Sequence, residues 1–334
     1  MHEAALYEKS GDKSVRCSLC SHRCHIADKK TGICGVRMNR SGVLYAESYG
    51  KVSCEAVDPV EKKPLYHFLP GSRVYSLGGI GCNFKCTHCQ NWEISQSTTG
   101  GFLHTLSPQK AVMNAKDSGC KSIAWTYNEP TIWHEYAMDV GKLAKNEGLK
   151  TIYVTNGYMT EEALNELSGM LDAFRVDIKA FSDEFYKKVC KARLQPVLDA
   201  AVKAKECGMH IETVTLLIPG LNDSPEELKK LSEWVYENLG CDTPVHFTAF
   251  HPDYNMTDVS PTPIETLEKA YMIAKEAGIR YPYLGNIRDH PFCSTWCHEC
   301  GALLIERSGY SQRNINLKDG VCVRCGAKIP ILNL

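Results

Sequence analysis

The sequence lacks a long apolar run, an excess of charge of one sign and an apolar leader. No stretch approaches the ~20 apolar residues that span a bilayer, and the opening MHEAALYEKSGDKS has no apolar core of signal-peptide length. Its 38 lysines and arginines nearly balance 39 acidic residues, so the net charge of -1 attracts neither nucleic acid nor an anionic membrane. We therefore expect a cytoplasmic protein that binds no membrane, and the charge gives no reason to expect a nucleic acid partner.

Cysteine, in contrast, is abundant, with 17 in 334 residues. Because the cytosol keeps thiols reduced, clustered cysteines in such a chain indicate metal binding rather than disulfides. They gather in three clusters, at 17–34, 82–89 and 297–325. Most of the cysteines outside these clusters are expected to be small buried hydrophobic residues.

The second cluster, GCNFKCTHCQNW at 81–92, supplies three thiolates: Cys82, Cys86 and Cys89. A closed structural ion site uses four ligands, and a [4Fe-4S] cluster held entirely by protein takes one thiolate per iron. Three thiolates therefore leave one iron open to a substrate or cofactor. The loop follows the strand-like RVYSL at 73–77, which places it beyond a strand end, where α/β folds carry their chemistry.

Between the second and third clusters, strand and helix patterns alternate. Ser-Pro pairs at 107–108 and 224–225 predict helix starts. Strands rich in β-branched or aromatic residues are predicted at 73–79, 122–127, 150–155, 173–179, 210–218 and 244–250. Six βα units indicate an α/β fold with a partial (β/α)6 TIM-like barrel, whose active site lies at the carboxyl ends of the strands.

Polar segments follow these strands at the predicted active-site end. They are TYNEPT (126–131), TNGY (155–158), DIKA (177–180), PGLND (219–223) and FHPDYNM (250–256). Asn-Gly and Pro-Gly are also ordinary turn sequences. Asp177 and Lys179 are harder to explain as a turn, because a spacing of two puts both charges on one side of the strand and buried charges need partners.

The chain resembles the radical S-adenosylmethionine (SAM) enzymes, whose shared feature is a CxxxCxxC loop after the first strand of a partial barrel. The resemblance implies that Cys82, Cys86 and Cys89 hold a [4Fe-4S] cluster whose fourth iron binds SAM. An electron from the cluster cleaves SAM to methionine and a 5'-deoxyadenosyl radical, which abstracts hydrogen from a substrate. A second match, CSTWCHEC at 293–300, is not followed by a barrel and is rejected as the catalytic loop.

Within this superfamily the chain is most similar to the pyruvate formate-lyase activating enzymes, and more closely to the radical enzymes of the AmmeMemoRadiSam system. The segments that carry the closer resemblance include CSLCSHRC, GICGVRMNRSG, EKKPLYHFLPGS, TYNEPT, FHPDYNMTDV and YLGNI. The activase resemblance implies that Glu129 and its neighbour Asn128 contact the amino group of SAM. It also implies that Asn156 lies near the ribose, with Asp177 and Lys179 near the methionyl carboxylate.

Three departures from the activase pattern limit what is carried over. His88 stands where an aromatic residue usually stacks near the adenine, so this planar but polar side chain takes that place. Val154 replaces an aspartate that helps the activases bind a monovalent cation, and that cation is not expected here. GNIRDH at 285–290 replaces GNVPGH, so the substrate-side loop is not transferred.

The third cluster forms a module with two similar knuckles, CHECG and CVRCG. Two thiolates on each knuckle predict a tetrahedral site made by Cys297, Cys300, Cys322 and Cys325. We expect zinc, as in a zinc ribbon, because it gives a small module folding energy without a redox role. Iron in a rubredoxin-like site is the alternative.

The first cluster comprises Cys17, Cys20, Cys24 and Cys34. A structural zinc and an auxiliary iron-sulfur cluster both fit these ligands, and unligated thiols are the third option. The chain is thereby divided into a Cys-rich N-terminal segment at 1–70, a radical SAM barrel at 71–290 and a four-cysteine module at 291–334.

Taken together, the residues and the resemblance predict a radical SAM oxidoreductase that takes electrons from a reducing donor protein. Its substrate is expected to be a glycine of a partner protein, with a small molecule or a non-glycyl peptide as the alternative. An iron-sulfur electron carrier or metal-dependent binding module is a further alternative. The polar set at the barrel end argues against it, since a carrier needs no such pocket.

Overall fold

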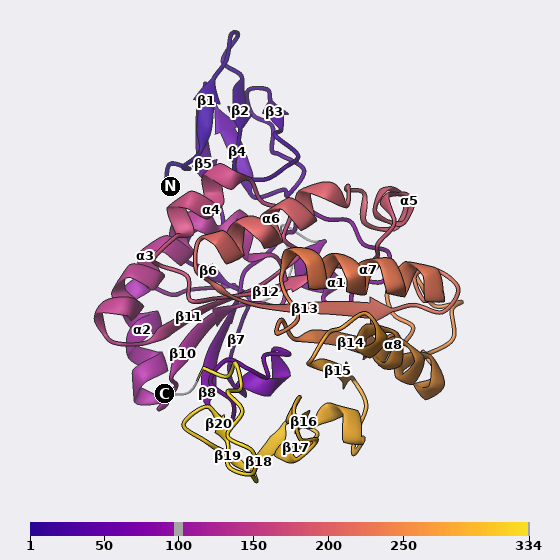
Figure 1. Cartoon of the computed structure of the whole chain (residues 1–334). Helices are drawn as coiled ribbons and strands as arrows, with labels where there is room; N and C mark the ends of the chain where they lie inside the picture. Colours follow the sequence, from indigo (N-terminus) through magenta and orange to yellow (C-terminus); the bar gives the residue numbers. More distant parts are fainter. Residues whose placement is uncertain (97–102, 333–334) are drawn as a thin grey trace.

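A computed structural model describes residues 1–96 and 103–332, and its centre is an eight-stranded sheet (Figure 1). The strand order is β15-β14-β13-β12-β11-β10-β8-β7, in which β7 pairs antiparallel with β8 and the other neighbours pair parallel. These strands are β7 (Cys54–Pro59), β8 (Arg73–Gly78), β10 (Ser122–Trp125), β11 (Lys150–Thr155), β12 (Ala173–Asp177), β13 (His210–Leu217), β14 (Val245–Ala249) and β15 (Pro282–Gly285). The predicted partial barrel is confirmed.

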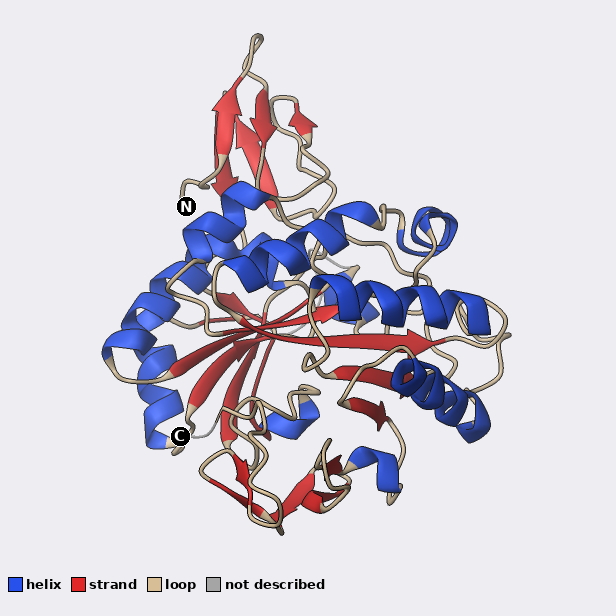
Figure 2. Cartoon of the chain, viewed as in Figure 1, coloured by secondary structure: helices blue, strands red, loops and turns tan. Residues whose placement is uncertain are grey.

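Helices cover the outer face of the sheet (Figure 2). The longer ones are α2 (Pro108–Asp117), α3 (His134–Asn146), α4 (Glu161–Leu167), α6 (Gln195–Glu206), α7 (Pro225–Asn238) and α8 (Ile264–Glu276). Short helical turns are α1 (Trp92–Ser95), α5 (Asp183–Phe185), the 3-10 turns Val60–Lys62, Pro130–Trp133 and Pro291–Cys293, and a π-helical turn, Tyr186–Cys190. Within the described residues no helix combines the length and apolar character needed to cross a membrane.

Local sequence explains where these helices begin. Ser107 accepts a hydrogen bond from the Lys110 backbone N–H, and Ser224 accepts one from Glu227. Each serine is followed by proline, whose fixed φ suits the first helical position and whose missing N–H has no partner there anyway. Both predicted helix starts are confirmed.

Buried apolar residues pack on both faces of the central sheet in separate clusters. All four residues of β10 are buried, and Trp125 packs edge-on against Tyr153 of β11. Parallel strands covered on both faces read as near-continuous apolar runs, which is the pattern that the sequence shows. This core fixes the strand ends, and with them the loops that carry the polar residues.

The first five strands of the N-terminal segment form small sheets at one end of the molecule (Figure 1). Its strands are β1 (Tyr7–Lys9), β2 (Val15–Cys17), β3 (His25–Ile26), β4 (Arg37–Arg40), β5 (Val43–Ala46) and β6 (Lys51–Val52), which pairs with β9 (His104–Thr105). The segment contacts the barrel at the end of β11, where Cys20 forms an isolated bridge with Met159. Arg23 adds an exposed ion pair to Glu162 of α4.

The C-terminal module lies between the two edges of the barrel sheet, which do not pair with each other in the described chain (Figure 1). Its apolar residues pack on Tyr281 and Tyr283 beside β15 and on Tyr66 after β7. Phe68 pairs with Leu332 near the end of the chain. The module is built from β16 (Thr295–Trp296), β17 (Leu303–Ser308), β18 (Ser311–Asn314), β19 (Leu317–Lys318) and β20 (Val321–Cys322).

Two strands of the central sheet were not predicted from the sequence. β7 lies within the segment 1–70 yet pairs along its whole length with β8, and β15 adds a seventh parallel strand after α8. Both are edge strands. A buried strand is recognised in a sequence by an unbroken apolar run. The first four residues of β7 instead alternate between half-buried and exposed. β15 has only four residues, which is too short for such a run to stand out.

Candidate active site

A cavity of about 530 Å³ opens at the carboxyl ends of the parallel strands. This volume is within the ~300–1,000 Å³ typical of ligand sites. Nine residues that the sequence analysis assigned to the cluster and to SAM line this one cavity: Cys82, Cys86, His88, Cys89, Asn128, Glu129, Asn156, Asp177 and Lys179. They come from the loop after β8 and from the ends of β10, β11 and β12, as the barrel topology requires.

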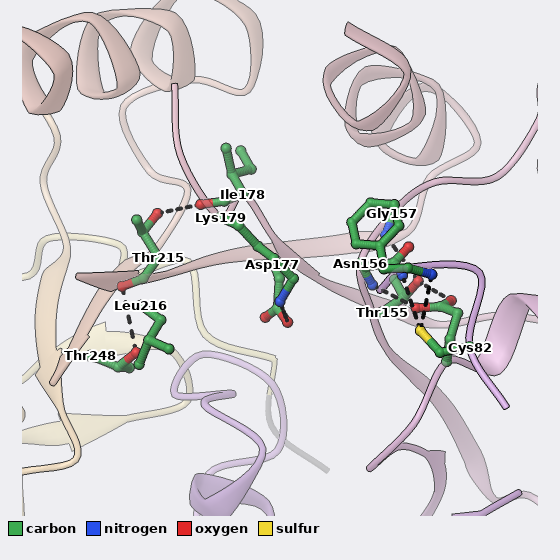
Figure 3. A network of polar contacts seen from close by, with 12 residues as sticks. Cys82, Thr155, Asn156, Gly157, Asp177, Ile178, Lys179, Thr215, Leu216 and Thr248 are labelled. Carbon is green, nitrogen blue, oxygen red and sulfur yellow. Dashed lines mark hydrogen bonds and ion pairs between the residues drawn. The ribbon is translucent and has the colours of Figure 1, made fainter. Parts of the chain in front are cut away.

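The three cysteines of the loop line this cavity, and two N–H groups are directed at the sulfur of Cys82. Cys82 and Cys86 are buried and Cys89 is half-buried. The Phe84 backbone N–H donates to Cys82 Sγ at 3.3 Å, and the Asn156 side-chain amide approaches the same sulfur at 3.8 Å (Figure 3). Burial, with the Glu129 charge, raises the pKa of Cys82 well above its usual value. Thiolates there require a cation, which a metal supplies.

The three loop sulfurs do not form a compact ligand group like that of the C-terminal module. Among residues 1–96 and 103–332, Cys297, Cys300, Cys322 and Cys325 form the one group of three or more ligand atoms that all lie within 4.8 Å of one another. The sulfurs of Cys82, Cys86 and Cys89 are therefore spread more widely. In a four-iron cluster each thiolate binds a different iron, which demands such a spread.

A fourth thiol, Cys190, lies beside the loop and was not assigned there from the sequence. A hydrogen bond between Cys86 and Cys190, followed by burial, raises the pKa of Cys86 well above its usual value. Cys190 ends the π-helical turn Tyr186–Cys190, and such turns occur frequently at functional sites. Only the fold brings residues 86 and 190 together, so the sequence carried no signal for this contact.

Glu129 is almost fully buried, with 1% of its surface exposed, and its carboxylate joins strand ends. Oε1 accepts hydrogen bonds from the Thr131 backbone N–H and from the hydroxyls of Thr131 and Thr155. Oε2 accepts one from the Asn156 backbone N–H at 2.8 Å. A carboxylate has about four acceptor positions distributed over two oxygens. Oε2 therefore retains an acceptor position for a ligand.

Asp177 lies between two cations at the end of β12. Lys179 Nζ is 3.0 Å from its Oδ2, and Arg175 contacts Oδ1. Burial opposes the Lys179 charge, but Cys86, Cys190, Tyr186 and Cys89 together outweigh it and raise the pKa of Lys179. Burial lowers the pKa of Arg175 to about 10, which leaves the guanidinium charged at neutral pH. The cavity therefore has one carboxylate and two cations on its β12 wall.

His88 presents a neutral ring to the cavity. Its exposed fraction is 4%, and burial, followed by the charge of Lys179, lowers the pKa of His88 to about 3. Its Nδ1 has no hydrogen-bond partner among the described residues. A flat, neutral side chain with an unused nitrogen is suited to contact a heterocyclic base.

The rim of the cavity holds residues that the sequence analysis did not assign, including Lys62, Lys63, Tyr127 and Tyr310. Asp58 joins three of them, since Lys63 Nζ lies 2.7 Å from one carboxylate oxygen, Tyr127 donates to the same oxygen, and Lys62 contacts the other at 2.9 Å. Burial lowers the pKa of Lys63 to about 8. The signal available in the sequence was the paired lysine of EKKPLY, but its approach to the barrel mouth depends on the fold.

The four C-terminal sulfurs form a compact group. Cys297 Sγ lies 3.6 Å from Cys325 Sγ, and Cys300 Sγ lies 3.8 Å from Cys322 Sγ. Thiolates about 2.3 Å from one ion in a tetrahedron stand about 3.8 Å apart, so the donors fit a single ion. Cys293 is outside this group, as predicted.

Comparison with known proteins agrees with the resemblance to radical SAM enzymes. A family model described as the Radical SAM superfamily matches residues 77–235. The uncharacterized protein MJ0808 of Methanocaldococcus jannaschii is 45% identical over 335 residues, covering 99% of this chain and 100% of the relative. The pyruvate formate-lyase-activating enzyme of Clostridium pasteurianum is 23% identical over 210 residues, covering 59% of this chain and 87% of that enzyme. A solved radical SAM methyltransferase from Sphaerobacter thermophilus shares the fold, with a TM-score of 0.50 at 15% identity over 65% of this chain and 67% of that chain.

Proposed function

The chain belongs to the radical SAM superfamily, and from this membership we propose that it is an oxidoreductase that abstracts hydrogen from a glycine of a partner protein. The single observation that carries the proposal is the cavity at the strand ends, which gathers three cysteines and a complementary set of charged and planar side chains. The similarity to an activating enzyme supports the partner-protein substrate. A reducing donor protein is the proposed source of electrons.

The loop cysteines are the residues that would hold the [4Fe-4S] cluster and leave one iron for SAM. When bound, the cluster supplies the electron that splits SAM into methionine and a 5'-deoxyadenosyl radical. Phe84 N–H and the Asn156 amide stabilise the charge on Cys82 by pointing N–H groups at its sulfur. Hydrogen bonds to cluster sulfurs are one of the factors that set a reduction potential.

The remaining polar side chains are proposed to orient SAM. Glu129 receives the amino group at the open acceptor position on Oε2. Lys179 and Arg175 attract the methionyl carboxylate, with Asp177 holding both cations in position. The His88 ring contacts the adenine, and Asn156 lies toward the ribose. Fixing these groups aligns the sulfonium with the cluster loop before the electron arrives.

The substrate side of the cavity is bounded by the rim residues. Tyr310 comes from the C-terminal module, while Lys62 and Lys63 come from the segment after β7. Closing the cavity with residues from distant segments keeps water and other hydrogen donors away from a radical. A second candidate follows from the same rim, because Lys62 and Lys63 also suit a small anionic substrate.

SAM cleavage tests the proposal directly. The anaerobically reconstituted protein, given dithionite and SAM, is expected to yield methionine and 5'-deoxyadenosine in amounts that depend on the cluster. A Cys86→Ala variant is the cluster-deficient control. Product formation no greater than in that control would overturn the assignment of an enzyme.

The substrate is tested separately. After a candidate glycyl partner is added, electron paramagnetic resonance is expected to show a glycyl radical on the partner. If SAM is cleaved but no radical forms on any partner, while deuterium from a labelled small anion enters 5'-deoxyadenosine, the second candidate replaces the first.

A further inference from the structure

The chain turns sharply between β10 and the residues that are proposed to receive SAM. The Asn128 backbone N–H donates to the Thr126 carbonyl at 3.0 Å, and the residue between them, Tyr127, has a φ of +72°. A hydrogen bond across one residue with positive φ defines the rare and strained form of the γ-turn. Glycine adopts such a φ readily, whereas a bulky aromatic residue seldom does. A strained backbone of this kind persists only where its surroundings hold it.

The side chain of Tyr127 is held by residues from outside the turn. Its hydroxyl donates to Asp58 Oδ2 at 2.7 Å, and Lys63 Nζ lies 4.4 Å from the centre of its ring. The ring also packs on β8, where a Cβ built at Gly78 would lie 3.0 Å from Tyr127 Cδ2. Because the ring is in contact at its face, its edge and its hydroxyl, the backbone of the turn cannot relax without breaking these contacts.

Asp58 is suited to hold this ring because it is buried and charged. It lies on β7, the antiparallel edge strand, with 5% of its surface exposed. Its carboxylate also accepts from Lys63 at 2.7 Å and from Lys62 at 2.9 Å. Burial opposes the negative charge, but hydrogen bonds from the two lysines and Tyr127 outweigh it and lower the pKa of Asp58. The tyrosine therefore donates to an ionised acceptor, which makes a stronger bond than a neutral one.

The γ-turn sets the direction of the two residues that follow it. Asn128 reaches back toward the cysteine loop, where its Oδ1 accepts from the Gly79 N–H at 3.1 Å and its Nδ2 donates to the Gly81 carbonyl at 2.9 Å. Glu129 reaches forward to the end of β11, where its Oε2 accepts a backbone hydrogen bond at 2.8 Å. One turn thus joins the loop proposed to hold the cluster to the carboxylate proposed to receive the amino group of SAM.

We propose that Asp58 and Tyr127 are positioning residues for SAM, and that the hydrogen bond between them keeps the γ-turn formed. This inference rests on the proposed function, since it concerns how SAM is received. Neither residue has to touch SAM. Without the bond, the turn relaxes to an unstrained backbone in part of the free protein. SAM then binds only the remaining fraction, so its apparent dissociation constant rises as that fraction falls.

Isothermal titration with SAM on the anaerobically reconstituted, cluster-loaded protein tests this inference. Tyr127→Phe removes only the hydroxyl, and the dissociation constant is expected to rise roughly tenfold, as for the loss of one hydrogen bond to a charged group. Asp58→Ala should weaken binding similarly. The double variant should bind no more weakly than the weaker single variant, because both changes remove the same bond. Iron and acid-labile sulfide should stay at wild-type amounts, because the cysteines are unchanged.

Tyr49→Phe is the matched control. Tyr49 also donates its hydroxyl to a carboxylate, that of Asp139 in α3, and it does not line the cavity at the strand ends. The control should bind SAM as the wild type does.

A Tyr127→Phe dissociation constant within twofold of wild type would overturn the inference, and so would single effects that multiply in the double variant. If Asp58→Ala fails to fold, the comparison of Tyr127→Phe with Tyr49→Phe decides alone. A wild type that holds its cluster but binds no SAM overturns the proposed function, and the inference with it; normal SAM binding by the wild type and by Tyr127→Phe overturns the inference only.

Discussion

Replacing Glu129 with glutamine tests whether this carboxylate contacts SAM or only joins strands. The side chain keeps its shape, and its carbonyl can still accept the three hydrogen bonds that now reach Oε1. The new amide group replaces Oε2, so two N–H donors face the Asn156 backbone N–H and the ligand amino group. One charged hydrogen bond to the protein is lost, and so is the proposed one to SAM.

The magnitude follows from these two bonds. A hydrogen bond to a charged group contributes about 1.5–3 kcal/mol, so the variant loses about that much unfolding free energy. Losing a second such bond from the complex weakens SAM binding roughly 10- to 150-fold, since about 1.4 kcal/mol corresponds to a factor of ten. Isothermal titration with SAM on the cluster-loaded protein measures the second effect, and thermal unfolding measures the first.

Glu212→Gln is the matched control for this experiment. Glu212 is fully buried and also has four partners: the Tyr66 and His67 backbone N–H groups and the rings of His210 and His246. It does not line the cavity at the strand ends. The control should lose stability but bind SAM normally. If Glu129→Gln behaves like the control, with a dissociation constant within twofold of wild type, Glu129 does not contact SAM.

Three other parts of the molecule respond to substitution in distinguishable ways. Asp177→Asn and Lys179→Ala should each weaken SAM binding and leave the cluster absorbance unchanged; lost thermal stability with normal binding would show a purely structural ion pair. Cys297→Ala/Cys300→Ala should release the C-terminal zinc or iron, measured by metal analysis, while some SAM cleavage persists; loss of the sulfide bound at the Cys82 loop would contradict this. Burial lowers the pKa of His67 to about 3 from an ordinary 6.5, so only the unfolded chain takes up this proton between those values. His67 should therefore contribute about 1.4 kcal/mol per pH unit to the fall in unfolding free energy below pH 6.5, and a His67→Asn variant measured by chemical denaturation should lose that part of the slope while the part due to His88 remains.

The sequence predicted the parts of the fold that depend on local chemistry. The CxxxCxxC loop after β8 and the serine caps of α2 and α7 are determined by neighbouring residues, and each is where it was expected. The polar segments after β10, β11 and β12 converge because parallel strands end at the same side of a sheet. The resemblance to radical SAM enzymes is confirmed by the family match and by the shared fold.

The rest could not be predicted because it depends on contacts between distant segments. Cys190 meets Cys86 only through an irregular turn, and Tyr310 reaches the cavity rim from a separate module. The acceptor positions of Glu129 are used by residues on two strands, which no spacing rule predicts. The roles assigned to the SAM-facing residues stay predictions until binding is measured.

The position of the C-terminal module means that the barrel is completed by something other than a strand. Arg307 from β17 lies buried against the Tyr66 ring, 4.1 Å from its centre, and donates to the Tyr66 carbonyl at 2.9 Å. Tyr283 of β15 packs edge-on against the same tyrosine. The module therefore joins the two free edges of the sheet, and an ion bound by its four cysteines would hold that junction together. If the cavity carries the radical chemistry proposed above, a chain made without that ion would form its parallel strands yet leave one side of the cavity open, so the supply of a structural metal would govern how well the radical is shielded.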